Sequence, residues 1–118
     1  MDTLLIVEDE WINYEYLAEV LHDRCNSILY AKNGQQAVDL CRNNDHIDLV
    51  LMDIKMPIMD GHSATRLIKA FRPELPVIAQ SAYSFETERE IFLESGFDDY
   101  ICKPIKLEVL LSIVSKYM

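Results

Sequence analysis

Residues 49–61 read LVLMDIKMPIMDG, a stretch in which four apolar residues lead directly into a single acid, Asp53. A short apolar run bounded by turn-forming residues is typical of a strand that is buried on both faces of a sheet. Asp53 would then stand at the carboxyl end of that strand. In an open α/β sheet, ligands bind at this edge, so it matters which other polar groups reach it.

Similar apolar runs alternate along the chain with segments of helical periodicity. Strands are expected at 3–7, 26–31, 48–53, 76–81 and 98–102. Helices are expected at 11–24, around 37–41, from Gly61 to about Pro73, at 85–95 with Gly96 as the C′ residue, and around 107–114. Strands that alternate with helices predict βαβ units, a parallel sheet and right-handed crossovers. We therefore expect one α/β domain over residues 1–118.

The composition narrows the functional classes. The chain has 118 residues, of which 50% are hydrophobic, and 20 acidic against 11 basic residues give a net charge of −9. This balance argues against direct nucleic-acid binding and against docking on anionic membranes. No apolar stretch approaches the roughly 18 residues of a membrane span, and MDTLLIVEDE lacks the basic start of a signal peptide. The three cysteines, without a C-x-x-C pair, are interpreted as reduced thiols of a cytoplasmic protein.

Polar residues stand where the predicted strands end. Glu8 and Asp9 follow the first strand, Ser81 ends the fourth and Lys103 follows the fifth. The carboxyl ends of parallel strands meet at one edge, so these groups should converge on Asp53. Three carboxylates without a cation would repel one another, and hard oxygen ligands suit Mg²⁺. A lysine and a hydroxyl suit phosphoryl oxygens, so the pattern predicts a carboxylate nucleophile that forms an aspartyl phosphate.

Each of these residues alone has a simpler explanation. A single aspartate or serine after a strand is more often a helix cap or a turn residue, and adjacent acids often lie in the first turn of a helix. Five such groups at one edge are harder to explain as independent caps. Their combination therefore favours a phosphoryl site.

With these residues in place, the chain resembles the receiver domain of two-component response regulators over essentially its whole length. LLIVEDE at 4–10 is similar to the acidic turn, and DLVLMDIKMPIMDG at 48–61 to the phosphoacceptor segment. PVIAQSAY at 76–83 is similar to the switch segment, and DYICKPI at 99–105 to the last strand. The resemblance implies a three-layer flavodoxin-like fold with five parallel strands in the order 2-1-3-4-5.

The resemblance also implies a role for each residue of the metal site. Asp53 is the expected phosphoacceptor, and Glu8 and Asp9 match the acids that bind Mg²⁺, or Mn²⁺ in its place. Asp53 itself and the main-chain carbonyl of Lys55 would complete the ligand set. Glu8 is longer than the aspartate that is common at its position, which alters its reach.

A second group of residues matches the family's switch. Ser81 matches the hydroxyl residue, Lys103 the lysine that pairs with the phosphoryl group, and Tyr100 the aromatic residue that swings inward. The Lys103–Pro104 peptide bond is expected to be cis, as is usual in the family. Such a switch would act through the helix at 85–95, the last strand and the last helix, which are also the expected surface of any dimer.

Two further positions are expected to tune the lifetime of the phosphoryl group. They lie two residues after the acceptor and two after the switch hydroxyl, and here they hold Lys55 and Tyr83. Neither is an amide or a carboxylate that could orient an attacking water. The resemblance therefore implies a slowly hydrolysed phosphoryl group.

The sequence is compatible with two kinds of parent protein. The chain could be a free-standing single-domain regulator or a receiver from a hybrid sensor histidine kinase, and MDIKMPIMDG, AQSAYS and CKPI resemble the hybrid kinases more. The expected partner is a histidine kinase or a histidine phosphotransfer domain. By itself the chain would be a self-phosphorylating switch rather than a turnover enzyme.

Two other protein classes fit the sequence less well. A flavodoxin-like electron carrier needs a hydroxyl-rich loop after the first strand, where this chain has EDEWIN. A phosphatase with an aspartate nucleophile needs a second acid two residues on, where this chain has Lys55.

Overall fold

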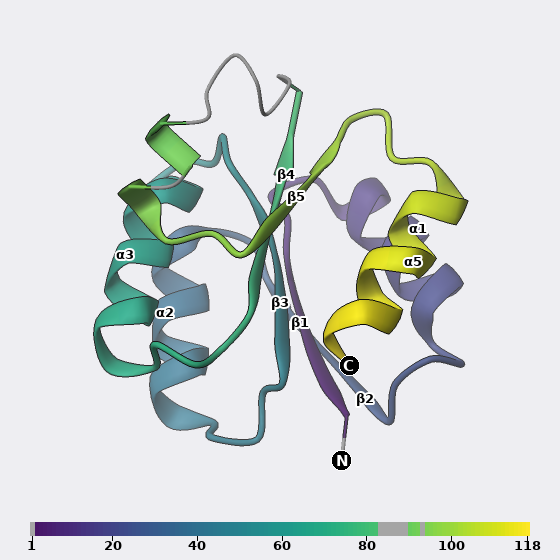
Figure 1. The fold of residues 1–118 in the computed structure, drawn as a ribbon, viewed down its shortest axis with the longest axis horizontal. Helices are drawn as coiled ribbons and strands as arrows, with labels where there is room; N and C mark the ends of the chain where they lie inside the picture. Colours follow the sequence, from purple (N-terminus) through teal and green to yellow (C-terminus); the bar gives the residue numbers. More distant parts are fainter. Residues whose placement is uncertain (1, 83–89, 93) are drawn as a thin grey trace.

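The structure, a computed structural model, describes residues 2–82, 90–92 and 94–118. The strands are β1 (Thr3–Val7), β2 (Ser27–Ala31), β3 (Leu49–Asp53), β4 (Val77–Ser81) and β5 (Asp99–Cys102). They form one parallel sheet in the order β2-β1-β3-β4-β5 (Figure 1). The predicted flavodoxin-like topology is therefore confirmed.

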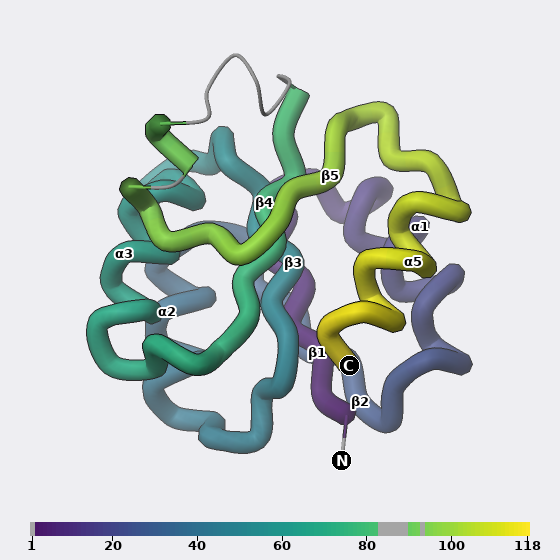
Figure 2. The backbone as a smooth tube through the Cα atoms, viewed as in Figure 1, coloured from purple at the N-terminus to yellow at the C-terminus, as the bar shows by residue number. Residues whose placement is uncertain are grey.

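Helices cover both faces of the sheet. They are α1 (Trp11–Leu21), α2 (Gly34–Asn43), α3 (Gly61–Phe71) and α5 (Leu107–Tyr117). In Figure 1, α2 and α3 lie on one side of the sheet, and α1 and α5 lie on the other. Figure 2 follows the backbone and shows that the first and last helices of the chain share a face. None of the described helices is long and apolar enough to cross a membrane.

The helix predicted at 85–95 lies partly outside the described residues. Residues 90–92 and 94–95 are helical. Gly96 follows with a φ of 90°, the left-handed conformation expected of a C′ glycine.

Each face of the sheet has its own apolar core, and β3 contributes to both. All five residues of β3 are buried. Val50 and Met52 belong to the cluster beneath α2 and α3, whereas Leu49 and Leu51 belong to the cluster beneath α1 and α5. Side chains of a strand point alternately to opposite faces, which explains why this central strand is apolar until Asp53.

The loop after β3 is held tightly against the end of the strand. The Gly61 N–H donates to the Ile54 carbonyl at 2.8 Å, and a Cβ built on Gly61 would lie 2.1 Å from the Asp53 carbonyl oxygen. Only a glycine fits so close an approach. The Asp60 side chain then caps α3 by accepting from the Ser63 N–H at 2.8 Å. The Asp-Gly pair thus fixes the backbone that presents Asp53.

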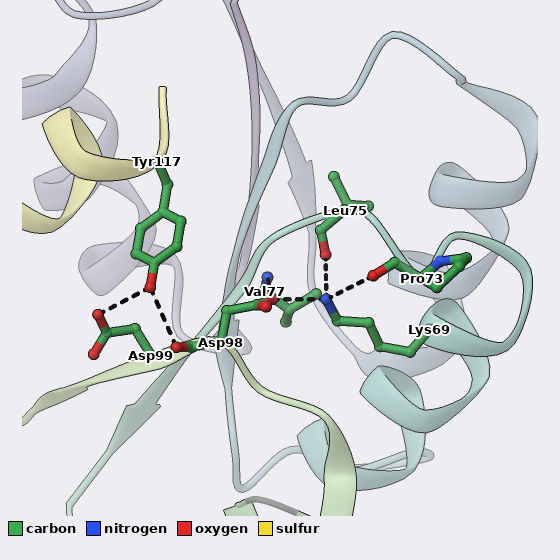
Figure 3. A network of polar contacts seen from close by, with 7 residues as sticks. All are labelled: Lys69, Pro73, Leu75, Val77, Asp98, Asp99 and Tyr117. Atoms are coloured by element: carbon green, nitrogen blue, oxygen red, sulfur yellow. Dashed lines mark hydrogen bonds and ion pairs between the residues drawn. The ribbon is translucent and has the colours of Figure 1, made fainter.

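A polar network joins α3, β4, β5 and α5 near the start of β4 (Figure 3). The Lys69 ammonium donates to the Leu75 carbonyl at 2.6 Å and to an Asp98 carboxylate oxygen at 2.7 Å. That same oxygen accepts the Val77 N–H at 2.8 Å, and the Tyr117 hydroxyl donates to the Asp98 carbonyl at 3.2 Å. We call these five residues the Lys69 clamp.

Candidate functional site

The predicted site residues gather at the carboxyl edge of the sheet. Asp53 and Ser81 are the last residues of β3 and β4, Glu8 directly follows β1, and Lys103 directly follows β5. A cavity of about 180 Å³ opens there, which we call the acceptor cavity. It is lined by Asp9, Glu10, Asp53, Ile54, Lys55, Gln80, Ser81, Ala82 and Lys103.

Lys103 links the two buried acids of the site. Its ammonium nitrogen lies 2.9 Å from Asp53 Oδ1 and 3.8 Å from Glu8 Oε2, and the Ile54 N–H donates to the same Asp53 oxygen at 2.9 Å. Asp53 is 4% exposed. Burial raises the pKa of Asp53, although the hydrogen bond and the charge of Lys103 counteract this. Burial is the largest single influence on Lys103 and works to lower its pKa, but the hydrogen bond to Asp53 and the negative charges of Asp53, Glu8 and Asp9 together outweigh it, so that pKa is raised.

Glu8 is the most perturbed acid of the site. It is fully buried, and its pKa is raised to about 7, first by burial and then by the negative charge of Asp53. Its Oε1 accepts the Glu10 N–H at 3.3 Å, and its Oε2 lies 3.8 Å from the Lys103 ammonium. The Asp53 carboxyl group is close enough to Glu8 to affect its pKa. Two buried carboxylates that share one lysine leave negative charge that a cation would compensate.

The acidic turn after β1 supplies the oxygen atoms that a metal ion would need. Carboxylate oxygens of Glu8, Asp9 and Glu10 all lie within 4.8 Å of one another. Glu10 was not predicted as a site residue, but it lines the acceptor cavity together with Asp9, Asp53 and Lys55, for which the sequence predicts metal-binding roles. A set of hard oxygen donors at one edge fits Mg²⁺, which favours carboxylates and carbonyls.

The proposed switch residues lie on neighbouring strands. Ser81 is 2% exposed, and its carbonyl accepts the Lys103 N–H at 2.7 Å. Tyr100 is half-buried and stacks on Phe92, with ring centroids 6.3 Å apart, in an apolar cluster that also contains Ile54.

Two smaller predictions have different outcomes. The Lys103–Pro104 peptide bond is cis, as expected. Tyr83, the second residue expected to tune the phosphoryl lifetime, lies outside the described residues.

Gln80 also lines the acceptor cavity, although the sequence did not lead us to predict it there. It pairs with Asp53 in the β3–β4 register, so both side chains point to the α1 and α5 face. It is fully buried, and neither of its amide atoms has a hydrogen-bond partner among the residues that the structure describes. The signal was present, because Gln80 is an uncharged polar residue inside the apolar run PVIAQS.

This geometry agrees with a comparison against known families. The sequence model of the response regulator receiver domain matches residues 4–115. The chain belongs to this receiver domain family. It is 35% identical over 120 residues to hybrid signal transduction histidine kinase I of Dictyostelium discoideum, an alignment that covers 95% of the chain. It is 36% identical over 114 residues to the sensor histidine kinase RcsC of Escherichia coli, with 97% of the chain covered.

Solved receiver domains have the same fold. The receiver domain of sensor histidine kinase PA1611 from Pseudomonas aeruginosa is 32% identical, with a TM-score of 0.86 over 98% of this chain and 95% of that one, and it holds a magnesium ion in its active-site cleft. The chemotaxis protein CheY4 of Vibrio cholerae gives a TM-score of 0.91 over 100% of this chain and 99% of its own. At 18% identity, CheY4 supports the fold alone.

The chain is a two-component receiver domain that is similar to the receiver domains of hybrid histidine kinases. It spans only 7% of the Dictyostelium kinase and 12% of RcsC. The activities of those longer proteins therefore bear on this chain only as proposals.

Proposed function

We propose that this receiver domain accepts a phosphoryl group on Asp53 in a reaction that depends on Mg²⁺. The observation that carries the proposal is the placement of a buried aspartate 2.9 Å from a lysine ammonium, beside the acidic turn and at the end of the central strand. A structural ion pair alone would not require two further acids at the same place.

Asp53 acts as the nucleophile. A carboxylate oxygen of Asp53 attacks the phosphorus of a phosphohistidine, the P–N bond breaks, and the imidazole leaves with the bonding electron pair and takes up a proton. Lys103 neutralises charge on the phosphoryl oxygens, and the Ser81 hydroxyl donates a hydrogen bond to them. The rigid strand β3 holds Asp53 in line for attack.

Glu8, Asp9, Asp53 and the main-chain carbonyl of Lys55 would hold the metal ion. When bound, Mg²⁺ supplies positive charge that offsets the charge developing on the phosphoryl oxygens. Mn²⁺, which also prefers oxygen ligands, would substitute for it.

Phosphorylation would shift the domain between two conformations. A phosphoryl group adds charge and strong acceptors at Asp53, which draws in Ser81 and Lys103. Tyr100 would then move toward the space that Ser81 leaves. The altered surface, formed by residues 90–95, β5 and α5, would serve for signalling or for a dimer.

The phosphoryl donor is proposed to be a histidine kinase or a histidine phosphotransfer domain. The similarity to receivers within long sensor kinases supports a hybrid sensor kinase as the parent protein. A free-standing regulator remains the alternative, and the DNA sequence on both sides of this reading frame would decide between them.

The test of the acceptor is intact-mass measurement after incubation with acetyl phosphate and Mg²⁺. We expect the mass to rise by one phosphoryl group, and we expect Asp53→Asn or a chelator to abolish the increase. Asp45→Asn, which removes an exposed acid before the start of β3, at the opposite edge of the sheet, is the matched control and should label normally. Labelling that survives Asp53→Asn would refute the assignment.

A further inference from the structure

A second and larger cavity lies between α1 and the connection from β5 to α5. Its volume is about 350 Å³, and we call it the α1 cavity. It shares Gln80 and Lys103 with the acceptor cavity, but its other walls are different. The lining residues are Glu8, Asn13, Tyr16, Leu17, Gln80, Lys103, Pro104 and Ile105.

Gln80 gives the α1 cavity a polar floor. Its side chain lies on the same face of β4 as that of Ile78, which packs in the α1 and α5 core together with Leu17. Gln80 is 0% exposed, and its amide nitrogen and oxygen make no hydrogen bond to any of the described residues. A side-chain amide offers two donors and one acceptor oxygen, and buried groups of this kind are nearly always paired. The Gln80 amide therefore points to a partner that enters the cavity.

The charges around the cavity indicate an uncharged partner. One carboxyl group, from Glu8, and one ammonium group, from Lys103, face the cavity 3.8 Å apart. Lys103 also contacts Asp53 at 2.9 Å, so the surplus negative charge lies toward the acidic turn, where the proposed metal ion would compensate it. The walls that belong to the α1 cavity alone, apart from Glu8, have no acidic or basic side chain: Asn13, Tyr16, Leu17, Pro104 and Ile105.

The remaining walls favour an organic molecule over water alone. Leu17, Pro104 and Ile105 supply an apolar surface, and a volume of about 350 Å³ is many times the roughly 30 Å³ that one water occupies in the liquid. A concave and mostly apolar site with a few convergent polar groups is the usual form of a small-molecule pocket. A planar carboxamide can pair with the Gln80 amide through two reciprocal hydrogen bonds.

We propose that the α1 cavity binds a small uncharged molecule that carries a carboxamide or lactam group, and that Gln80 recognises this group. An aromatic or aliphatic body would pack on Leu17, Pro104 and Ile105. Lys103 lines both cavities and contacts Asp53, so occupancy should also change the rate of Asp53 labelling by acetyl phosphate. That consequence rests on the proposed function, whereas binding itself does not.

The test is a benzamide titration of the ¹⁵N-labelled protein, observed by NMR. The side-chain amide signals of Gln80 are assigned as the pair that is absent from the spectrum of Gln80→Leu, a variant in which the side chain has a similar volume. We expect these signals to shift saturably in the wild type, and Gln80→Leu to bind at least tenfold more weakly. Gln35→Leu removes an exposed glutamine of α2 and should leave the affinity unchanged. Acetophenone, which keeps the acceptor but lacks the donor, should bind more weakly than benzamide.

A second variant keeps the test decisive if Gln80→Leu does not fold. Ile105→Phe narrows the cavity from a half-buried loop position outside the sheet and should also abolish the benzamide shift. An unsaturable titration of the wild-type Gln80 signals would overturn the proposal. Undiminished affinity in either folded variant would overturn it equally.

Discussion

Glu8 carries a charge that should depend on pH in the neutral range, because burial and the charge of Asp53 raise its pKa to about 7. In the unfolded chain this pKa lies near 4.5. Between these values the folded protein binds more protons than the unfolded chain, so the free energy of unfolding falls as the pH rises through that window. The stabilising contribution is complete below about pH 4.5 and is lost above about pH 7.

We therefore expect the wild type to lose stability relative to Glu8→Gln as the pH rises from 5 to 7. The difference should be about 2 kcal/mol, since one pKa unit corresponds to roughly 1.4 kcal/mol. Urea unfolding of both proteins without divalent metal would measure it. Parallel pH profiles for the two proteins would show that Glu8 titrates at an ordinary pKa.

Lys55 is exposed beside the acceptor cavity, at the position expected to influence hydrolysis of the phosphoryl group. An ammonium group cannot accept a hydrogen bond from the attacking water, so we expect Lys55 to position this water poorly. Exchanging Lys55→Asn together with Tyr83→Glu should speed dephosphorylation about tenfold to hundredfold, which corresponds to roughly 1.4 to 2.7 kcal/mol of the barrier. Decay of the phosphorylated protein in Mg²⁺ measures this rate. Lys116→Asn, which changes an exposed lysine in the last turn of α5, is the control. An unchanged decay rate in the double variant would show that Lys55 and Tyr83 do not set the phosphoryl lifetime.

Some residues of the site could be predicted from the sequence and others could not. Asp53, Ser81 and Lys103 are polar groups at the ends of apolar runs, so the parallel topology alone brings them to one edge. Gln80 lies inside such a run. The sequence alone cannot show that its amide has no hydrogen-bond partner among the described residues. The Glu10 carboxylate comes close to those of Glu8 and Asp9 because of the shape of the turn after β1. Residue types alone do not specify that shape.

Among the secondary-structure elements, β4 and β5 are the ones through which a conformational change at the site could be transmitted to the surface. The Lys103 N–H bonds the Ser81 carbonyl where the strands end, and Tyr100 on β5 stacks on Phe92. A movement of Ser81 or Lys103 would therefore disturb the packing of Tyr100.

We expect beryllium fluoride with Mg²⁺, a phosphoryl mimic, to change amide hydrogen exchange within residues 90–102. Mass spectrometry of the exchanged protein would measure it, with Asp53→Asn as a variant that should not respond. Helix α2, which packs on α3 away from β5, should exchange identically in both states. The proposed switch surface would be wrong if residues 90–102 also exchanged identically.

The ends of the elements were harder to predict than the elements themselves. The first helix was expected to run to Arg24, but α1 ends at Leu21, whose carbonyl accepts the Arg24 N–H at 2.9 Å in a closing turn. No glycine or proline marks this end. The last strand was expected from residue 98, but it begins one residue later, at Asp99. Asp98 binds Val77 through its N–H and its carboxylate, and the carboxylate also binds Lys69. Such contacts join residues that are distant in sequence.

Across the whole molecule, β4 connects two different features, the acceptor cavity at one end and the Lys69 clamp at the other. Ser81 belongs to the acceptor cavity, while Val77 at the other end belongs to the Lys69 clamp. A five-residue strand separates them by roughly 13 Å at about 3.3 Å per residue. Apolar cores lie on both faces of the sheet between these ends. The chemistry can therefore change at one edge while the other edge keeps the sheet and α5 in place.

This separation predicts that the clamp affects stability and leaves the chemistry intact. The Lys69 side chain is only 16% exposed. Lys69→Met keeps most of its volume but removes the donor to Asp98 and Leu75. Leaving these acceptors with fewer partners should lower the free energy of unfolding by about 1–3 kcal/mol, measured by urea unfolding. Lys32→Met, at an exposed position, should change it by less than about 0.5 kcal/mol. The extent of Asp53 labelling by acetyl phosphate in folded Lys69→Met should equal that of the wild type, and impaired labelling would mean that the two edges are coupled.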